Sequence, residues 1–333
     1  MKKRVTMRDI GQALGVSTVT ISKALGGREG VSDAVREKIL KTAQEMGYSY
    51  PTPGNPREET PGEIVGILMP ARFFGTGSFY AALYMELTAK LLEAGMLGTL
   101  EIISPEKEES AQPPVLLETG KVTALVVMGN VAASYLDMLN GAGLPAVLLD
   151  FYSENTDFDA VVSDGQGGSF LLTQMLLSRG HREIGFVGSI DRTSSIMDRY
   201  SGYLRAMVLS GVQTQDAWRI PDCKPDGSYL DELPLPEKMP TAFVCNNDNV
   251  VMQLKTELEK RGLRVPEDIS VTGFDDFPPR GDGFLTTYHV DQERMALATV
   301  RQLRRRMQDG AEGAVRIVVG GWMVQGRSVA DRS

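Results

Sequence analysis

The chain has 333 residues, 42% of them hydrophobic, and a formal net charge of −8 at pH 7. This is enough apolar material for two or three packed domains. No apolar run approaches the roughly 20 residues that span a bilayer, and the charged start KKRVTMRD lacks the apolar region of a signal peptide, so we expect a cytoplasmic protein with no membrane partner. The two cysteines, Cys223 and Cys245, lack a C-x-x-C spacing, which predicts free thiols and no metal site.

The first 25 residues predict two short helices joined by a tight turn. Thr6 and Asp9 form a T-x-x-D capping box, so the first helix begins near residue 7, and Gly15 ends it. Ser17 caps the second helix. The apolar positions of that helix are Val19, Ile21, Ala24 and Leu25, and the positions left for a partner are Thr18, Thr20, Ser22 and Lys23.

A third helix is predicted over residues 32–47, with its apolar side chains buried, namely Val35, Ile39, Leu40, Ala43 and Met46. Three helices with a short second one fit a helix-turn-helix unit, in which the second helix enters the major groove of DNA. The alternative is a helical hairpin whose Ser and Thr side chains only cap and solvate. Charge favours DNA binding: residues 1–50 carry nine Lys or Arg against five Asp or Glu, a net charge of +4, which leaves −12 for the rest of the chain.

Residues 51–61, PTPGNPREETP, contain four prolines, so they predict a linker. After it, short apolar runs alternate with amphipathic helical patterns. The alternation predicts parallel sheets with helices on both faces, and the number of strands indicates two such sheets. The predicted strands are 64–69, 99–103, 124–128, 146–150, 160–163, 184–188, 242–245, 269–273 and 315–319, and the predicted helices are 80–94, 169–179, 201–210, 249–261 and 294–307.

Ligands in open sheets of this kind bind beyond the carboxyl ends of the strands. The polar residues that follow predicted strands are Asp150, Asn246, Asn247, Asp248, Asp275 and Asp276, and Arg199 lies after another strand. Carboxylates, amides and an arginine in one cleft suit a polyhydroxylated ligand. Each residue alone is as readily a helix cap or a loop charge, which is the interpretation we favour for Asp276.

These segments together carry a family resemblance. The run DIGQALGVSTVTISKAL, the segments LLSRGHREIGFVG and RYSGY, AFVCNND, VPEDISVTGFDD and the final GGWMVQGRS resemble the lactose-repressor (LacI) family of bacterial transcription regulators over nearly the whole chain. The resemblance implies an α/β protein with a three-helix DNA-binding domain and a periplasmic-binding-protein-like core of two doubly wound parallel-sheet subdomains. The implied domains are residues 1–50, a linker at 51–61, one subdomain at 62–163 with 291–319, and another at 164–290 with 320–333.

The resemblance also implies roles for individual residues. Thr18, Val19 and Lys23 match base-reading positions, and Thr6, Ser17, Thr20 and Ser22 match phosphate or positioning contacts. Lys23 can donate to guanine O6 and N7 in the major groove. Asp150, Arg199, Asn247 and Asp275 match positions that line the effector cleft, and Phe74, Ser78 and Phe79 match its wall.

One segment departs from the family pattern. Relatives usually follow the third helix with a hinge helix whose leucine wedges into the DNA minor groove. The matching segment here, SYPTPGNPREETPG, has no leucine and too many prolines for a helix. We therefore expect operator binding chiefly through the helix-turn-helix domains.

The sequence thus predicts a dimeric regulator, expected to act as a repressor, that binds a palindromic operator and a small effector, with a sugar as the expected class and no cofactor. Nucleobases and protein corepressors are further effectors used in this family. One alternative is a cytoplasmic carbohydrate-binding protein with a non-functional DNA-binding head. Another is an enzyme, against which the two histidines, His181 and His289, stand in no recognisable catalytic or metal-binding arrangement.

Overall fold

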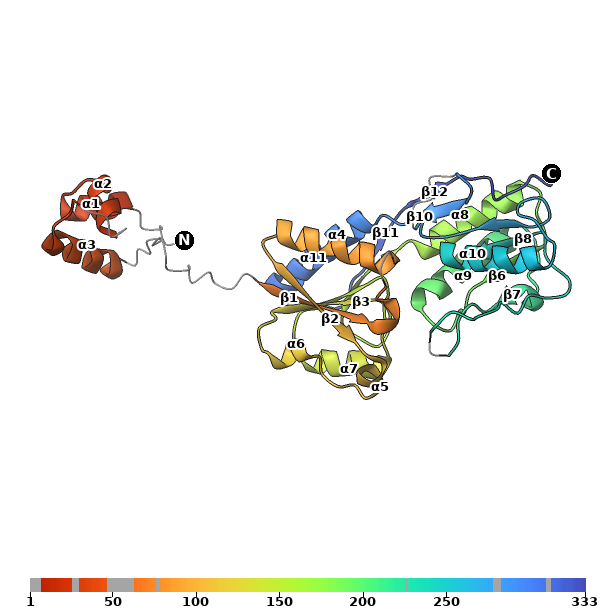
Figure 1. Cartoon of the computed structure of the whole chain (residues 1–333), viewed down its shortest axis with the longest axis horizontal. Helices are drawn as coiled ribbons and strands as arrows, with labels where there is room; N and C mark the ends of the chain where they lie inside the picture. Colours follow the sequence, from red (N-terminus) through yellow and green to blue (C-terminus); the bar gives the residue numbers. More distant parts are fainter. Residues whose placement is uncertain are drawn as a thin grey trace. The chain divides into compact units, whose positions relative to one another are not determined.

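A computed structural model describes residues 7–25, 30–46, 63–75, 78–225, 227–277, 283–309 and 313–333. The chain divides into two compact units, Met1–Gly62 and Glu63–Ser333, which we call the head and the core (Figure 1). The predicted linker at 51–61 lies outside the described residues. No helix in the described parts of the chain is long and apolar enough to cross a membrane.

The described part of the head contains α1 (Met7–Leu14), α2 (Thr18–Leu25) and α3 (Asp33–Glu45), which confirms the three predicted helices. Gly15 has a φ of 68° and ends α1 as expected. The centre of the unit is formed by the buried side chains of Ile10, Ile21, Ala24, Leu25, Ile39 and Ala43.

Two predictions about the third helix are wrong. Val35 and Leu40 are 37% and 48% exposed, although we expected both to be buried. Leu40 is one residue beyond Ile39 and so lies about 100° away around the helix, outside the stripe that faces α1 and α2. Val35 lies in the first turn of α3, at the margin of the same stripe.

The core contains a first lobe built on a six-stranded parallel sheet. Its strands in spatial order are β11 (Arg316–Val319), β5 (Asp159–Ser163), β4 (Ala146–Leu149), β3 (Ala124–Met128), β1 (Ile64–Pro70) and β2 (Leu97–Ile103). The helices of this lobe are α4 (Phe79–Glu93), α5 (Pro105–Glu109), α6 (Val115–Glu118), α7 (Ala133–Gly141) and α11 (Gln292–Asp309), with the 3₁₀ turn η1 (Ala71–Phe73) after β1.

Helices cover both faces of this sheet (Figure 1). Val65 and Ile67 of β1 pack with α4 and α11, whereas Leu68 packs on the opposite face with α7. Alternate strand residues point to opposite faces, so burial on both faces requires the continuous apolar runs found in β1 and β3.

The second lobe is built on a four-stranded parallel sheet. Its strands in spatial order are β7 (Arg219–Ile220), β6 (Ile184–Val187), β8 (Ala242–Cys245) and β9 (Ser270–Thr272). On one face lie α8 (Gly165–Ser178) and α9 (Ser194–Leu209), and on the other α10 (Asp248–Lys260), while η2 (Asp216–Trp218) precedes β7. The expected pair of parallel sheets is therefore present.

Every predicted strand and helix of the core is found, with ends that shift by a few residues, but some elements escaped prediction. These are η1, η2, α5, α6, α7, β7 and an antiparallel pair formed by β10 (Thr287–His289) and β12 (Trp322–Val324). Apart from α7, these elements span only two to five residues, which is too short for a hydrophobic period to be recognised. Helix α9 begins at Ser194, earlier than the predicted 201, because Thr193 caps it by accepting from the Ile196 amide.

Candidate functional site

The N-terminal turn of α2 is held by Ser17. Its hydroxyl accepts the Thr20 amide at 3.1 Å and contacts the Thr20 hydroxyl at 2.9 Å, so Ser17 is the expected helix cap. Before this turn, the Val16 amide donates to Gly11 O of α1 at 3.1 Å, and a side chain at Gly11 would lie 2.8 Å from the Val16 carbonyl oxygen. This close approach explains the glycine at position 11 of α1.

The predicted DNA-reading side chains lie along α2. Thr18 and Lys23 are exposed, and Thr20 and Ser22 are half-buried. The buried face of the same helix is occupied by Ile21, Ala24 and Leu25. Val19 belongs to α2, and Thr6 lies outside the described residues. The helix therefore presents polar donors on the side opposite its packed face, as a groove-reading helix requires.

In the core, Asp150 follows β4 and is 5% exposed. Its Oδ2 accepts the Tyr80 hydroxyl at 2.8 Å, and the Tyr80 ring packs on Phe73 with centroids 4.6 Å apart. Its Oδ1 is buried without a hydrogen-bond partner among the described residues. Burial raises the pKa of Asp150, while the Arg199 charge and the Tyr80 hydrogen bond lower it.

Arg199 of α9 comes from the second lobe and is 6% exposed. One terminal nitrogen donates to the backbone O of Asn246 at 2.7 Å and to its Oδ1 at 3.3 Å, and the other donates to Asp275 Oδ1 at 3.0 Å. The guanidinium carbon lies 4.0 Å from the centroid of the Phe274 ring. Four contacts thus fix the guanidinium plane, and its Nε is buried without a partner in the described structure.

Asp150 and Asp275 both have unusual backbone conformations, with φ of 68° and 99°. Non-glycine residues rarely adopt positive φ, and such strain is typical of functional sites. Burial raises the pKa of Asp275 to about 7, the Arg199 charge opposes the rise, and the neighbouring carboxylates of Asp248 and Asp150 add to it. Burial and the Asp150 charge raise the pKa of Tyr80, the Asp275 charge adds to the rise and the Arg199 charge opposes it, so charges of the second lobe act on a side chain of the first.

This cluster pairs a carboxylate oxygen that can only accept with an arginine nitrogen that can only donate. Both atoms are buried and unpartnered among the residues described. A buried polar atom without a partner is costly unless something else satisfies it. Ligand hydroxyls can satisfy atoms of both kinds, because a hydroxyl donates to a carboxylate and accepts from a guanidinium.

The other predicted cleft residues have local roles as well. Asn247 caps α10 by accepting the Val250 amide at 2.9 Å, and its amide donates to the Tyr229 hydroxyl at 3.0 Å. Ser78 caps α4 by accepting the Ala81 amide at 3.1 Å. Phe79 packs edge-on against Tyr80 and against Phe277, with centroids 5.5 and 6.2 Å apart. Phe74 is 58% exposed.

Sequence reasoning missed Tyr80 and chose Asn247 over Asn246. Tyr80 directly follows the predicted wall residue Phe79, so its position at the start of α4 was the available signal. Asn246 was among the residues that follow strands, and its contact with Arg199 depends on a separation of 47 residues that no local pattern reveals. Asp276, predicted as a cap or surface charge, contacts His289 Nδ1 at 2.9 Å, and His289 stacks on Trp322.

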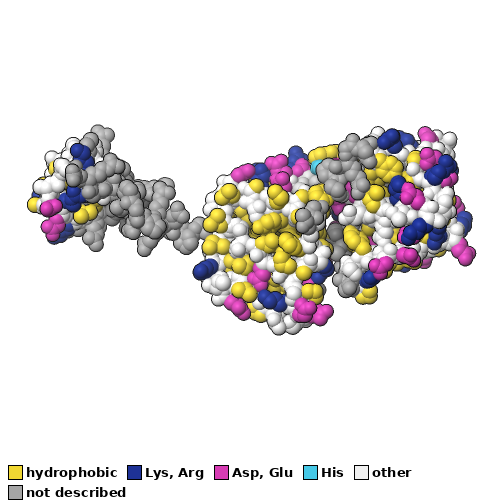
Figure 2. All heavy atoms as spheres, viewed as in Figure 1, with side chains coloured by type: hydrophobic (Ala, Val, Ile, Leu, Met, Phe, Trp, Pro, Cys, Tyr) yellow, Lys and Arg dark blue, Asp and Glu magenta, His cyan; other side chains and the backbone are white. Residues whose placement is uncertain are grey.

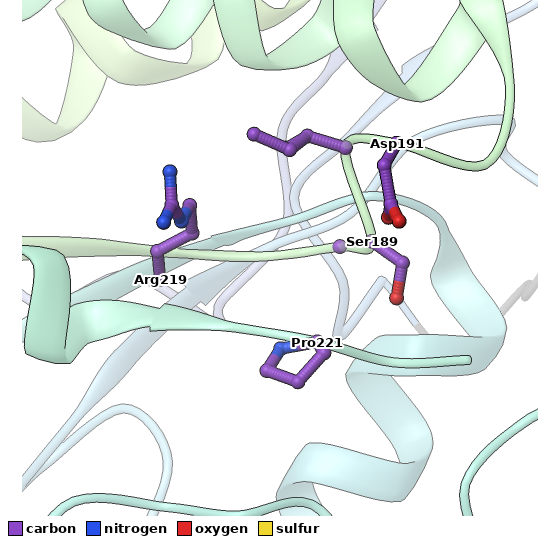
Figure 3. A pocket seen from close by; sticks show the side chains of 6 residues that line it. Ser189, Asp191, Arg219 and Pro221 are labelled. Atoms are coloured by element: carbon purple, nitrogen blue, oxygen red, sulfur yellow. The ribbon is translucent and has the colours of Figure 1, made fainter. Parts of the chain in front are cut away.

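A separate pocket of about 330 Å³ lies beside β6 and β7 (Figure 3). Its lining residues are Gly188, Ser189, Ile190, Asp191, Arg219 and Pro221. The Ser189 hydroxyl accepts the amides of Asp222 and Cys223, both at 3.0 Å, so it joins the loops after the two strands. The predicted effector residues do not line this pocket.

The GQGGSF run at 165–170 forms the start of α8. Asp164 caps this helix by accepting the Gly167 amide at 2.8 Å. A side chain at Gly168 would meet the Tyr288 and Phe274 rings within 2.8 Å, so this glycine lets the two rings pack against α8.

Comparison with protein families gives two matches. Residues 6–50 match the model described as bacterial regulatory proteins, lacI family, and residues 173–329 match that of a periplasmic binding protein-like domain. Among curated proteins, the HTH-type transcriptional repressor PurR of Photobacterium profundum is 26% identical over 313 residues, covering 91% of this chain and 92% of that protein. PurR of Erwinia tasmaniensis is 26% identical over 342 residues, covering 98% and 97%.

Solved structures share the fold. The transcriptional regulator CelR in complex with cellobiose gives a TM-score of 0.67 at 22% identity, covering 98% of this chain and 100% of that one. The lac repressor dimer bound to operator and the anti-inducer ONPF gives 0.65 at 19% identity, covering 98% and 100%. A LacI family regulator from Enterococcus faecium with bound ribose gives 0.65 at 20% identity, covering 81% and 100%. The chain is thus similar to lacI-family regulators over nearly its whole length, with a lacI-type segment at 6–50 and a periplasmic binding protein-like domain at 173–329.

Proposed function

We propose that this protein is a DNA-binding transcriptional repressor whose affinity for its operator is set by a small hydroxyl-bearing effector, with a sugar as the expected class. The observation that carries the effector assignment is the pair of buried, unpartnered atoms, Asp150 Oδ1 and Arg199 Nε, which come from different lobes of the core. The bound cellobiose and ribose in two structural neighbours support a sugar.

The effector site comprises Asp150, Arg199 and Asp275, with Asn247, Phe74, Ser78 and Phe79 at its margin. Because this set draws on both lobes, a ligand that bridges them prefers one arrangement of the lobes over another. A preference worth about 1–3 kcal/mol changes operator affinity roughly 5- to 150-fold. We place the two subdomains at 62–163 with 291–319 and at 164–290 with 320–333.

The DNA assignment rests on the polar face of α2. We propose that Thr18, Val19 and Lys23 read bases, and that Thr6, Ser17, Thr20 and Ser22 contact or position phosphates. Lys23 is exposed and carries the charge that can donate to guanine. Since the predicted linker lacks the family's leucine wedge, footprinting should show no kinked, protected step at the operator centre.

The effector site is tested by a thermal-shift screen of the purified protein against sugars and nucleobases, because a ligand that binds only the folded state raises the melting temperature. We expect a sugar to raise it, and Arg199→Ala and Asp275→Ala to abolish the rise. If both variants keep the full rise in melting temperature, the assignment of Arg199 and Asp275 to the effector site is wrong. A shift produced by nucleobases alone contradicts the sugar assignment and leaves the site intact.

The DNA assignment is tested by selecting DNA sequences that bind the full chain and measuring the affinity of Lys23→Ala for them. We expect loss of about 1–3 kcal/mol of sequence discrimination. Lys41→Ala, an exposed lysine on α3, is the matched control for loss of a positive charge. If the wild-type chain selects no sequence while sugar binding persists, the alternative of a carbohydrate-binding protein with a non-functional head is correct.

We also propose a homodimer, because a two-fold pair of heads matches a palindromic operator. The first lobe exposes large apolar side chains on α4 and the edge strand β2, namely Met85 (69% exposed), Leu92 (67%) and Leu97 (54%). Hydrophobic side chains also gather on the visible face of this lobe (Figure 2). Apolar patches of this kind mark protein interfaces.

A further inference from the structure

Tyr152 joins the two lobes of the core beside the proposed effector site, which includes Asp150 and Arg199. Tyr152 follows β4 in the first lobe, two positions after Asp150. Its hydroxyl donates to Asp198 Oδ1 of α9 at 2.9 Å, and its backbone amide donates to Ser194 Oγ at 3.2 Å. A side chain and a backbone group of one residue therefore bind the first turns of a helix in the other lobe.

Tyr152 is itself anchored to the first lobe. The Arg316 guanidinium of β11 lies 3.2 Å from the centroid of the Tyr152 ring, and Arg316 also pairs with Glu154 at 2.9 Å. A guanidinium on an aromatic face fixes the ring, because the positive charge is attracted to the ring quadrupole. The hydroxyl is thereby held toward α9 by contacts that belong to the first lobe alone.

Tyr152 and Asp198 both lie within two positions of a residue of the proposed effector site. Asp198 precedes Arg199, and Tyr152 is separated from Asp150 only by the fully buried Phe151. Burial raises the pKa of the Asp198 carboxyl, and its hydrogen bond from Tyr152 together with the nearby Arg316 charge opposes that rise. Groups of the first lobe, together with Arg199 of α9, thus stabilise the charge of this carboxyl.

We propose that Tyr152 is a positioning residue that holds the first turns of α9, and with them Arg199, against the first lobe. Ligand residues of the two lobes then keep their mutual placement before any effector binds. When the hydrogen bond from the Tyr152 hydroxyl to Asp198 is removed, the lobes separate more often at this edge. The hydrogen bond from the Tyr152 backbone amide to Ser194 then opens as well. The proposal concerns the ligand-free core and stands whether or not the effector is a sugar.

Amide hydrogen exchange of the ligand-free full chain tests this proposal at the backbone amide of residue 152, whose acceptor lies in the other lobe. We expect Tyr152→Phe to speed this exchange by about tenfold, the effect of losing a hydrogen bond to a charged group. Asp198→Ala, in the opposite lobe, should speed the same amide equally. Asp198→Asn keeps an acceptor oxygen and should restore most of the protection.

The control is Tyr203→Phe. Tyr203 lies on the same helix, and its hydroxyl donates to Ile184 O within the second lobe at 2.8 Å, so this variant weakens the lobe without removing a contact between lobes. Exchange at residue 152 should remain unchanged in it. The double variant Tyr152→Phe with Asp198→Ala should exchange no faster than the faster single variant. Additive effects, or the same acceleration in Tyr203→Phe, overturn the proposal.

Discussion

Tyr80 and Asp150 show how one hydrogen bond determines which atoms the proposed effector site offers to a ligand. The Tyr80 hydroxyl occupies one carboxylate oxygen of Asp150, and the other oxygen remains available in a buried position. Burial raises the pKa of Tyr80 well above its usual value, and the negative charge of Asp150 adds to this rise, so the phenol keeps its proton and remains a donor. Asp150 is therefore presented as an acceptor, which selects ligands with a donor at that point.

Removing the Tyr80 hydroxyl should destabilise the core. In Tyr80→Phe the buried Asp150 carboxylate loses its hydrogen bond, which costs about 1–3 kcal/mol. Tyr135→Phe is the matched control, because the buried Tyr135 hydroxyl has no partner among the described residues and its loss should be neutral or stabilising. Urea unfolding of both variants measures the difference, and equal effects on the free energy of unfolding would refute this account.

The raised pKa of Asp275 predicts a pH dependence of stability. Burial raises this pKa from 3.8 to about 7, so between these values the folded chain binds a proton that the unfolded chain releases. The resulting stabilisation is present at low pH and is lost as the pH rises toward 7. Because Asp275→Asn cannot titrate, its free energy of unfolding should rise relative to that of the wild type as the pH increases from 5 to about 7.5. Urea unfolding at several pH values checks the sign, and a difference that is constant across this range contradicts it.

At the scale of elements, the backbones of α8 and α9 approach so closely that position 202 of α9 requires glycine. An added side chain at Gly202 of α9 would lie 2.1 Å from Gln166 O and 2.9 Å from Phe170 N of α8. Both are backbone atoms, which cannot move aside without shifting the helix. This packing sets the position of α9, and therefore of Arg199 and Asp198, relative to the second sheet.

Gly202→Ala should lower the free energy of unfolding by about 3 kcal/mol, at the upper end of the cost of overpacking. The control is Gly141→Ala at the end of α7, where an added methyl group has no atom within 4 Å. That change should be neutral or stabilise by up to about 1 kcal/mol, since alanine favours helices. Chemical denaturation compares the two, and a Gly202→Ala variant as stable as the wild type would show that the helices can separate at little cost.

At the scale of the whole molecule, the proposed homodimer makes the exposed apolar side chains of α4 and β2 an interface. A charge on this face should weaken association, because a buried unpaired charge at an interface is costly. We expect Leu97→Glu to convert the dimer to a monomer in sedimentation velocity experiments. Val208→Glu, at an exposed apolar position on α9, is the control and should remain dimeric. A reversed result would place the interface on the second lobe.

Much of this architecture was predictable because its signals are local. Ser17, Gly15 and the continuous apolar run of β1 act within a few positions of themselves, through a helix cap, a positive φ and burial on both faces of a sheet. The strand-end rule likewise selected Asp150 and Asp275 before their neighbours were known. The predicted burial of Leu40 was wrong because residue type alone does not define where the apolar stripe of a helix ends.

The sequence by itself determined a basic helix-turn-helix head, a core of parallel sheets and the carboxylates at the ends of its strands. Only the tertiary structure decided which side chains meet: Tyr80 with Asp150, Arg199 with Asn246 and Asp275, and Tyr152 with Asp198. These partners lie between 46 and 76 residues apart. Their contacts depend on the order of strands and the packing of helices between lobes, which periodicity and capping do not encode.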